Sequence, residues 1–400
     1  MFTVTKDVIL PTTVTGSWPR PRWFNVGAWG RPLSTAMMEL TFREQFSDAL
    51  AVVVSDQERA GLDIVTTGDF YCDEDFFGRS WVHYPLERLE GMEGDHAPPA
   101  DRWDLEHAYP PGTILHEIFT GWRGPHVVAD VEPSRDNLEY ARIWRLAQAR
   151  AKQPVKFGTV SAQALALLAE PRVERYLTDK RKELLWDLSV AMNSELRSLA
   201  AAGCKVIQVE EPNFHFFEYP YDSEDLDFLI EAFNREVEGL DEVEVWVHTC
   251  FGNPNMQRVF ETTRYLDEAV EIYLERLNVD VLTVEMKDRD QADLEAFARY
   301  RNSTDTKLAI GVVSHRSLQV ETAEEVARDV RGALEHVRAE NLILSSDCGF
   351  GRQGCNRSIA FYKAAAIAQG ANIVRRELGL PESSVPAADP ALQVEVLGDR

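Results

Sequence analysis

Two side chains that can bind a metal stand two residues apart in the stretch VEVWVHTC (243–250). They are His248 and Cys250, and they end a run of β-branched residues that predicts a β-strand. A strand places residues i and i+2 on the same face, so the imidazole and the thiolate would point together. This pair of ligands suits a soft or borderline metal such as zinc. By itself the pair does not define a metal site, because a lone buried cysteine is usually an inert core residue.

The rest of the chain places this pair in a repeating pattern of strands and helices. The short apolar runs are 12–17, 63–69, 155–160, 205–210, 243–249, 279–285, 307–313 and 342–347. The helical stretches between them are roughly 36–60, 136–152, 171–202, 222–238, 254–276, 289–302, 322–339 and 357–378. Apolar strands that alternate with helices are typical of a parallel sheet that is covered on both faces. Eight such units predict an α/β fold, a (β/α)8 TIM barrel, and a doubly wound open sheet is the alternative.

Residues 70–135 depart from this pattern. They are rich in Trp, Tyr, Pro, Gly and acidic residues, and we interpret them as a long insertion after the second strand. A hairpin or a lid over one end of the barrel is the expected form. We expect residues 1–380 to make a single catalytic domain and residues 381–400, which are Pro- and Ala-rich, to make a peripheral tail.

The residues that end the predicted strands are unusually polar for a barrel. They are Ser17, Asp69, Thr159, Ser161, Glu210, Glu211, His248, Cys250, Glu285, Ser314, His315, Arg316, Asp347 and Cys348. In (β/α)8 barrels, functional residues gather at the C-terminal ends of the strands. Helix capping would explain a serine or an aspartate at such a position, but it explains a histidine or a cysteine poorly.

Four of these side chains form a candidate zinc site: His248, Cys250, Glu285 and Cys348. Structural zinc sites usually use closely spaced C-x2-C pairs, which this sequence lacks. Ligands from three strand ends on a catalytic face therefore predict a reactive zinc ion with a replaceable position. A thiolate-rich zinc ion is well suited to bind a substrate thiol and to lower its pKa. The chemistry that this set predicts is alkyl transfer to sulfur.

Several short segments give the chain a resemblance to the catalytic domain of cobalamin-independent methionine synthase. They are TGSWP (15–19), TTGD (66–69), IQVEEP (207–212), HTC (248–250), LTVE (282–285) and SSDCGFG (345–351), in the order in which that family has them. The resemblance implies a zinc-dependent methyltransferase of methionine biosynthesis, with the same four residues as zinc ligands. It also implies that Ser17, Asp69 and Glu210 hold the amino acid part of homocysteine, the thiol that accepts the methyl group.

The chain departs from the family pattern in ways that concern the alkyl donor. The family's catalytic histidine after the seventh strand falls on Arg316, with His315 one position earlier, so we expect His315 or Arg316 to assist the leaving group. Asp69 stands where the family usually has Glu, and the family's folate-packing Trp is replaced near Val160. The length of 400 residues corresponds to the short, single-barrel form. The donor thus stays open between a methyltetrahydrofolate, including its triglutamate form, and a corrinoid protein.

Other reactions and classes are alternatives. In an epoxyalkane:coenzyme M transferase-like enzyme the thiol would open an epoxide, and Arg316 would bind the sulfonate or would simply pair with Glu321 or Glu324. A zinc hydrolase would use Glu210 or Glu211 as base, but no H-E-x-x-H is present. A metal-free barrel decarboxylase of the uroporphyrinogen type predicts Arg and Asp clusters instead. GFGRQG (349–354) matches a dinucleotide-binding G-x-G-x-x-G, but no strand with a terminal acid follows about 20 residues later.

Composition excludes several partners. Lys and Arg number 42 against 66 Asp and Glu, a net charge of −24, which argues against nucleic acid and anionic membranes as partners. No run of 18 apolar residues and no signal peptide pattern is present. An odd, sparse set of five cysteines fits reduced thiols in a cytoplasm. A homo-oligomer is compatible with the sequence.

Overall fold

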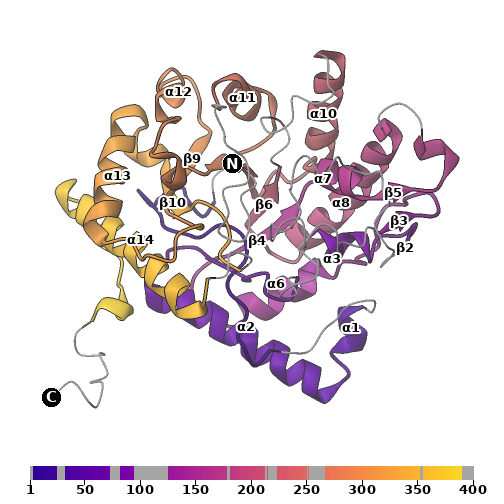
Figure 1. The fold of residues 1–400 in the computed structure, drawn as a ribbon, viewed down its shortest axis with the longest axis horizontal. Helices are drawn as coiled ribbons and strands as arrows, with labels where there is room; N and C mark the ends of the chain where they lie inside the picture. Colours follow the sequence, from indigo (N-terminus) through magenta and orange to yellow (C-terminus); the bar gives the residue numbers. More distant parts are fainter. Residues whose placement is uncertain are drawn as a thin grey trace, which may run out of the picture.

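The computed structural model describes residues 3–24, 32–72, 82–93, 125–177, 181–211, 214, 223–249, 251, 266–351 and 355–389. Its centre is a seven-stranded parallel sheet, within a ring of helices (Figure 1). In spatial order the strands are β1 (Val65–Thr66), β4 (Val155–Val160), β6 (Val206–Glu210), β7 (Glu244–Thr249), β8 (Val281–Val284), β9 (Lys307–Val313) and β10 (Leu342–Ser346). The spatial order equals the chain order, so the sheet lacks the reversal that defines a doubly wound fold. The open-sheet alternative is therefore wrong.

The first predicted run closes the sheet into a barrel. Thr12 forms a parallel bridge with Leu344 of β10. Its backbone oxygen accepts hydrogen bonds from the N–H groups of residues 63 and 64, just before β1, at 3.1 and 3.0 Å. The run 12–17 thus lies between the two edge strands, although it forms a single bridge instead of a regular strand. The prediction of an eight-unit barrel is confirmed.

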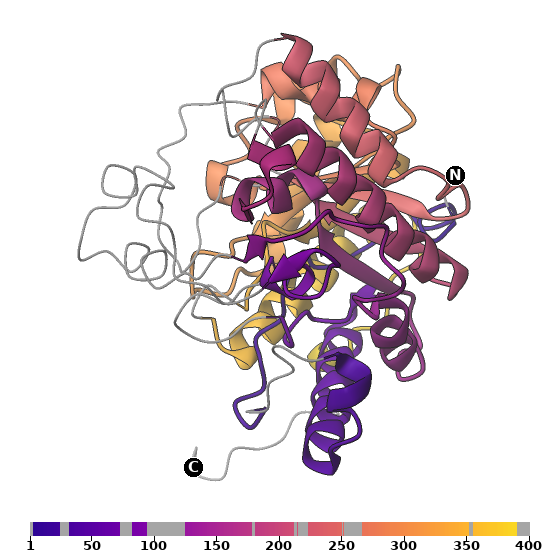
Figure 2. The ribbon, with the colours of Figure 1, turned by 90° about the vertical axis from the view of Figure 1, so that its right-hand side faces the viewer.

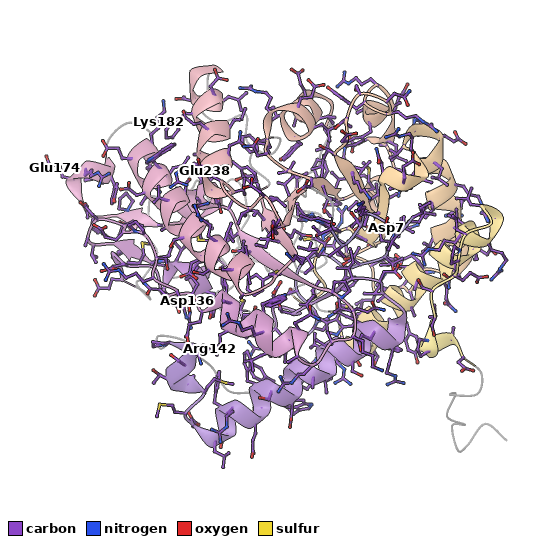
Figure 3. All side chains as sticks on the ribbon, turned by 180° about the vertical axis from the view of Figure 1, so that it is seen from behind. Asp7, Asp136, Arg142, Glu174, Lys182 and Glu238 are labelled. Carbon is purple, nitrogen blue, oxygen red and sulfur yellow. The ribbon has the colours of Figure 1, made fainter. Side chains whose placement is uncertain are left out.

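Helices cover the outside of the barrel. The longer ones are α2 (Leu40–Ala60), α6 (Tyr140–Gln148), α8 (Lys182–Ala201), α10 (Ser223–Glu236), α13 (Ala323–His336) and α14 (Arg357–Glu377), and shorter ones are α7 (Ala162–Leu168), α11 (Asp267–Glu271) and α12 (Leu294–Ala298). Figures 1 and 2 show α2 on one side of the barrel, next to α14. Charged side chains such as Asp136, Glu174 and Glu238 lie on the outer surface (Figure 3). Among the described helices, none has both the length and the apolar character needed to cross a membrane.

Part of the predicted insertion forms a second, small sheet. β2 (Met92–Glu93) pairs antiparallel with β3 (His126–Val127), which pairs in parallel with β5 (Glu170–Pro171). The hairpin form of the whole insertion stays a prediction. Residues 73–81 and 94–124 lie outside the described part of the chain, so a lid over the barrel stays a prediction, as do the bounds of the catalytic domain and the tail.

The two ends of the barrel differ. At the N-terminal ends of the strands, the buried carboxylate of Glu244 accepts hydrogen bonds from the backbone N–H groups of residues 3, 4 and 5 at 2.7, 2.5 and 2.7 Å. The N-terminal segment therefore closes this end. Above it lies a small apolar core inside the barrel, made by Ile64, Val206, Trp246, Val281, Ala309 and Ile343. The C-terminal ends of the strands form the opposite end, which we call the mouth.

Candidate active site

Asp347, directly after β10, connects the ends of two strands at the mouth. Its buried carboxylate accepts hydrogen bonds from the backbone N–H groups of residues 286, 287 and 288, which follow β8, at 2.8, 2.8 and 2.7 Å. Gly311 of the intervening strand β9 permits this approach, since a Cβ there would lie 2.7 Å from the Asp347 Cα and would collide with its carboxylate. As a result, the segments that carry Glu285 and Cys348 meet at the mouth.

Glu285 is a fully buried carboxylate at the end of β8, with 0% exposure. Its Oε1 accepts a hydrogen bond from Nη2 of Arg316 at 2.5 Å, and its Oε2 accepts one from the backbone N–H of Phe251 at 3.0 Å. Phe251 follows Cys250 in the chain, whereas Cys250 itself lies outside the described residues. A carboxylate has about four lone-pair sites, so these two bonds leave Glu285 able to bind a metal as well.

His248 lies at the end of β7, beside its register partner Glu210 on β6. Its imidazole is 1% exposed, and Nε2 lies 3.5 Å from Oε2 of Glu210. Burial raises the pKa of Glu210 to about 8; the hydrogen bond from Gln208 and the charge of Lys156 oppose this rise, and Asp69 adds to it. A ligand cation beside Glu210 would lower this pKa again. Glu210 and Asp69 are thus suited to bind an ammonium group.

Asp69 follows β1 in a left-handed backbone conformation, with φ of 47°. The hydroxyl of Thr67 donates a hydrogen bond to its Oδ1 at 2.7 Å. A Cβ at Gly158 of β4, the strand between β1 and β6, would lie 3.1 Å from Oδ2 of Asp69. The glycine therefore leaves room for the Asp69 carboxylate over β4, on the side toward Glu210.

Ser17 lies against the chain that follows β10. Its backbone oxygen accepts hydrogen bonds from the N–H groups of Phe350 and Gly351 at 2.8 and 3.0 Å. A Cβ at Gly349 would lie 2.5 Å from the backbone nitrogen of Ser17. The glycines of GFGRQG that the structure describes thus serve close packing beside Cys348. Since β10 is the last strand of the barrel, the dinucleotide-binding interpretation is wrong.

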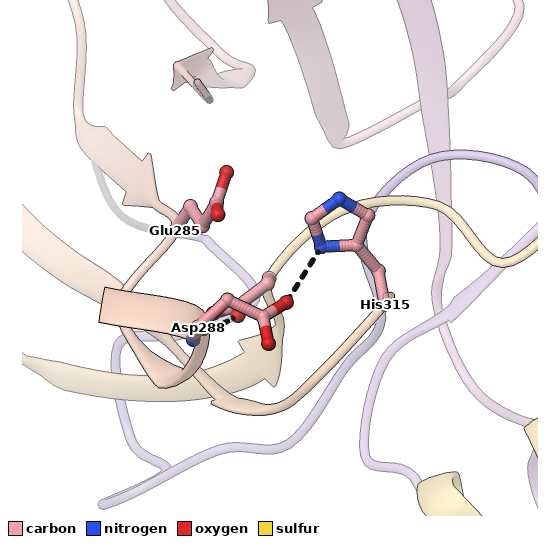
Figure 4. A group of neighbouring side chains, drawn as sticks. Glu285, Asp288 and His315 are labelled. Atoms are coloured by element: carbon pink, nitrogen blue, oxygen red, sulfur yellow. Dashed lines mark hydrogen bonds and ion pairs between the residues drawn. The ribbon is translucent and has the colours of Figure 1, made fainter. Parts of the chain in front are cut away.

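His315 and Arg316 follow β9, and both contact Asp288, a residue that the sequence analysis missed. Nδ1 of His315 lies 3.2 Å from Oδ2 of Asp288 (Figure 4), and Nε of Arg316 lies 3.1 Å from the same oxygen. Burial acts to raise the pKa of Asp288, but hydrogen bonds from His315 and Ser314 and the charge of Arg316 outweigh it and lower this pKa. A carboxylate at Nδ1 fixes the histidine tautomer, so Nε2 is the nitrogen available for proton transfer.

One cluster of ligand atoms among the described residues differs from the predicted zinc set. It comprises Glu285, Asp288, His315 and Asp347, whose atoms lie within 4.8 Å of one another. The guanidinium of Arg316 already bridges two of these carboxylates, and both oxygens of the third accept backbone N–H groups. The predicted set shares Glu285 with this cluster and adds the softer ligands His248 and Cys348, which fit zinc better.

Two further cysteines, Cys72 and Cys204, have sequence positions that favour a core or surface thiol over a metal ligand. Cys204 precedes β6 and is fully buried, and burial raises its pKa to about 12. It therefore stays a thiol at neutral pH, which makes it a poor metal ligand. Cys72 is also buried, and its backbone N–H donates a hydrogen bond to the backbone oxygen of Asp69 at 2.9 Å.

The fold, with a buried histidine and buried carboxylates at the mouth, defines an α/β-barrel enzyme, and comparisons with known proteins give the family. The family described as cobalamin-independent synthase, catalytic domain, matches residues 119–369. The methionine synthase of Sulfurisphaera tokodaii is 30% identical over 92% of this chain and 94% of its own, and that of Saccharolobus solfataricus is 28% identical over 94% and 98%. The structure of a B12-independent methionine synthase from a Shewanella species, in complex with selenomethionine, has a TM-score of 0.73 and 25% identity, covering 93% of this chain and 99% of that one. This chain belongs to the cobalamin-independent methionine synthase family, which confirms the resemblance.

Proposed function

We propose that this protein is a zinc-dependent S-methyltransferase that transfers a methyl group to homocysteine to give methionine. Relatives that match at least 92% of the chain are named methionine synthases, and the similar Shewanella structure holds selenomethionine, the selenium analogue of methionine. The observation that carries the proposal is the burial of His248 and Glu285 at the ends of two neighbouring strands. An imidazole and a carboxylate enclosed together at a barrel mouth are ligands suited to a catalytic zinc ion.

The zinc ion would be held by His248, Cys250, Glu285 and Cys348. When bound there, it would lower the pKa of the substrate thiol, so that the sulfur is a nucleophile at neutral pH. Arg316 and the backbone of Phe251 hold the carboxylate of Glu285 in one orientation. This fixed orientation would reduce the rearrangement that metal binding requires.

Substrate orientation would come from acidic side chains at neighbouring strand ends. Glu210 and Asp69 would bind the ammonium group of homocysteine, and Ser17 would contact its amino acid part. The sulfur would then attack the methyl carbon in line, so that the new S–C bond forms as the bond to the donor breaks. His315 in its protonated form, held by Asp288 at Nδ1, would give the proton on Nε2 to the leaving atom of the donor and become the neutral tautomer with its proton on Nδ1.

The contacts of Arg316 argue against the coenzyme M alternative. Its guanidinium donates to Glu285 and pairs with Asp288, and Nη2 also lies 3.3 Å from the backbone oxygen of Asp288. A sulfonate would have to compete with these buried carboxylates for the same cation. The pairing of Arg316 with Glu321 or Glu324, considered above, is also absent among the described contacts, where Glu321 pairs with Lys363 instead.

The proposal is tested by incubating the zinc-loaded protein with homocysteine and, in turn, with 5-methyltetrahydrofolate, its triglutamate form and methylcobalamin. We expect mass spectrometry to detect methionine with at least one donor. Cys348→Ser should lose zinc and activity together, whereas Cys204→Ser, at the other end of β6, should keep its zinc. If Cys348→Ser retained full zinc and full activity, the ligand set would be wrong.

A further inference from the structure

A lysine is buried inside the barrel, below the mouth. Lys156 on β4 is 1% exposed; its Nζ donates a hydrogen bond to Oε1 of Gln208 at 2.7 Å and lies 4.6 Å from the ring centroid of Trp246. Gln208 on β6 donates from Nε2 to Oε1 of Glu210, also at 2.7 Å. A continuous chain of hydrogen bonds, Lys156 to Gln208 to Glu210, therefore runs from the middle of the barrel to its mouth.

Lys156 sets the direction of every hydrogen bond in this chain. In its protonated form Lys156 can only donate, so Gln208 then turns its amide oxygen toward Lys156 and its NH2 group toward Glu210. The NH2 group can only donate as well, so Oε1 of Glu210 must accept. Oε2 is then the oxygen that faces His248, at 3.5 Å. With an apolar residue at position 156, the amide of Gln208 could flip and present its oxygen to Glu210, which would repel the carboxylate.

The position of Lys156 costs stability. Burial lowers its pKa to about 7, and Glu210 and Asp69 oppose this shift only in part. Its Nζ contacts a neutral amide and an aromatic ring rather than a paired carboxylate. Lysine is rarely buried without such a pair, because desolvation of the charge is unfavourable. A residue that lowers stability beneath a site is best explained by what it does for that site.

We propose that Lys156 is a positioning residue, which acts through Gln208 to hold Glu210 as the hydrogen-bond acceptor for the ammonium group of the substrate. This inference rests on the proposed function, in which Glu210 binds the ammonium group of homocysteine. It makes Lys156 and Gln208 determinants of specificity for amino thiols over thiols that lack the amino group. Lys156 would act through Gln208 rather than by touching the substrate, since its Nζ contacts Gln208 and Trp246.

The test compares homocysteine with 4-mercaptobutanoate, the same thiol without its amino group. Lys156→Met removes the donor and keeps a side chain of similar length. Dissociation constants are measured by calorimetry on the zinc-loaded protein, with KM and kcat for both thiols. We expect the preference for homocysteine over 4-mercaptobutanoate to fall about tenfold in Lys156→Met. This is the effect of one weakened charge-assisted hydrogen bond. The loss should appear in the KM for homocysteine, while kcat and the KM for 4-mercaptobutanoate stay within about twofold.

Lys307 provides a matched control. It is also a lysine buried in the barrel, on β9, but its Nζ donates to the backbone oxygen of Thr5 at 2.6 Å, at the closed end. Lys307→Met should leave the preference between the two thiols unchanged. Gln208→Met breaks the chain at its second bond and should reproduce the effect of Lys156→Met. The double variant should be no worse than either single one, because both remove the same interaction.

The outcomes separate the two proposals. If the wild type binds neither thiol, the proposed function fails, and the inference about Lys156 falls with it. If the wild type prefers homocysteine and both Lys156→Met and Gln208→Met keep that preference, the positioning role is refuted while the proposed function stands. An equal loss in Lys307→Met would also refute it, since the effect would then be a general consequence of altering the barrel interior. If Lys156→Met does not fold, Gln208→Met alone decides.

Discussion

Replacing Lys156 by Met should change how the stability of the protein depends on pH. In the folded protein burial lowers the pKa of Lys156 to about 7, from its ordinary 10.5. The unfolded chain therefore binds this proton more tightly, and folding is penalised at every pH below 10.5. The penalty is complete below about pH 7 and fades between pH 7 and 10.5. Met at this position titrates nowhere in this range, so Lys156→Met lacks the penalty.

The size of the effect follows from the pKa difference. At 1.36 kcal/mol per pKa unit, the penalty is about 4 kcal/mol at pH 7, where the folded group is about half protonated, and about 1 kcal/mol at pH 10. The lost hydrogen bond to Gln208 offsets part of the gain in the variant, by about 1–3 kcal/mol at either pH. Between pH 7 and pH 10, the free energy of unfolding of the wild type should therefore rise by about 3 kcal/mol relative to that of Lys156→Met. This change does not depend on which protein is the more stable at either pH.

The assay is urea unfolding of both proteins at pH 7, 8, 9 and 10, followed by circular dichroism. Lys6→Met serves as the control, because Lys6 is exposed to solvent. Its difference from the wild type should not vary with pH. If the difference between the wild type and Lys156→Met were the same at pH 7 and pH 10, the reasoning about the buried lysine would be refuted.

Three further variants test contacts at the mouth. Arg316→Leu leaves the buried carboxylates of Glu285 and Asp288 without their counter-charge, so the free energy of unfolding of the metal-free protein should fall by about 3–5 kcal/mol. Zinc should then raise the thermal midpoint of the variant more than that of the wild type. Equal midpoints of the two metal-free proteins would contradict this prediction. Gly311→Ala forces Asp347 away from residues 286–288 and should lower both stability and zinc content. Gly332→Ala is the control, because no atom lies within 4 Å of a Cβ at that position, and it should stabilise α13 by about 1 kcal/mol in urea unfolding. Lys363→Met removes the buried partner of Glu321, whose carboxylate holds the backbone N–H of Ser314. It should lower the free energy of unfolding by about 3 kcal/mol and also lower kcat. Arg331→Met, the control, breaks an exposed ion pair and should lower the free energy of unfolding by under about 1 kcal/mol.

Most strands could be predicted from the sequence, because each is a short apolar run bounded by polar or turn-forming residues. The predicted runs 155–160 and 307–313 coincide with β4 and β9. The run 12–17 is the exception: it occupies the eighth position but makes only a bridge at Thr12. A helix was predicted over 254–276; the described part of that range is helical over 267–276, and the rest lies outside the described residues.

The candidate site could be predicted in part. Parallel strands end together at one mouth, so residues at predicted strand ends were expected to meet, and His248 does lie beside Glu210. Asp288 was missed because it lies beyond a strand end, in a turn that Asp347 holds from 59 residues away. Lys156 was missed because its strand is buried along nearly its whole length, and such a run does not show which residues point into the barrel.

Zinc K-edge X-ray absorption, recorded before and after the addition of homocysteine, tests the proposed zinc chemistry most directly. The four proposed ligands, His248, Cys250, Glu285 and Cys348, would give a zinc shell of mixed sulfur, nitrogen and oxygen. We expect homocysteine to add one sulfur neighbour at about 2.3 Å. A shell that homocysteine leaves unchanged, or a protein that binds no zinc, would contradict thiol activation at this mouth.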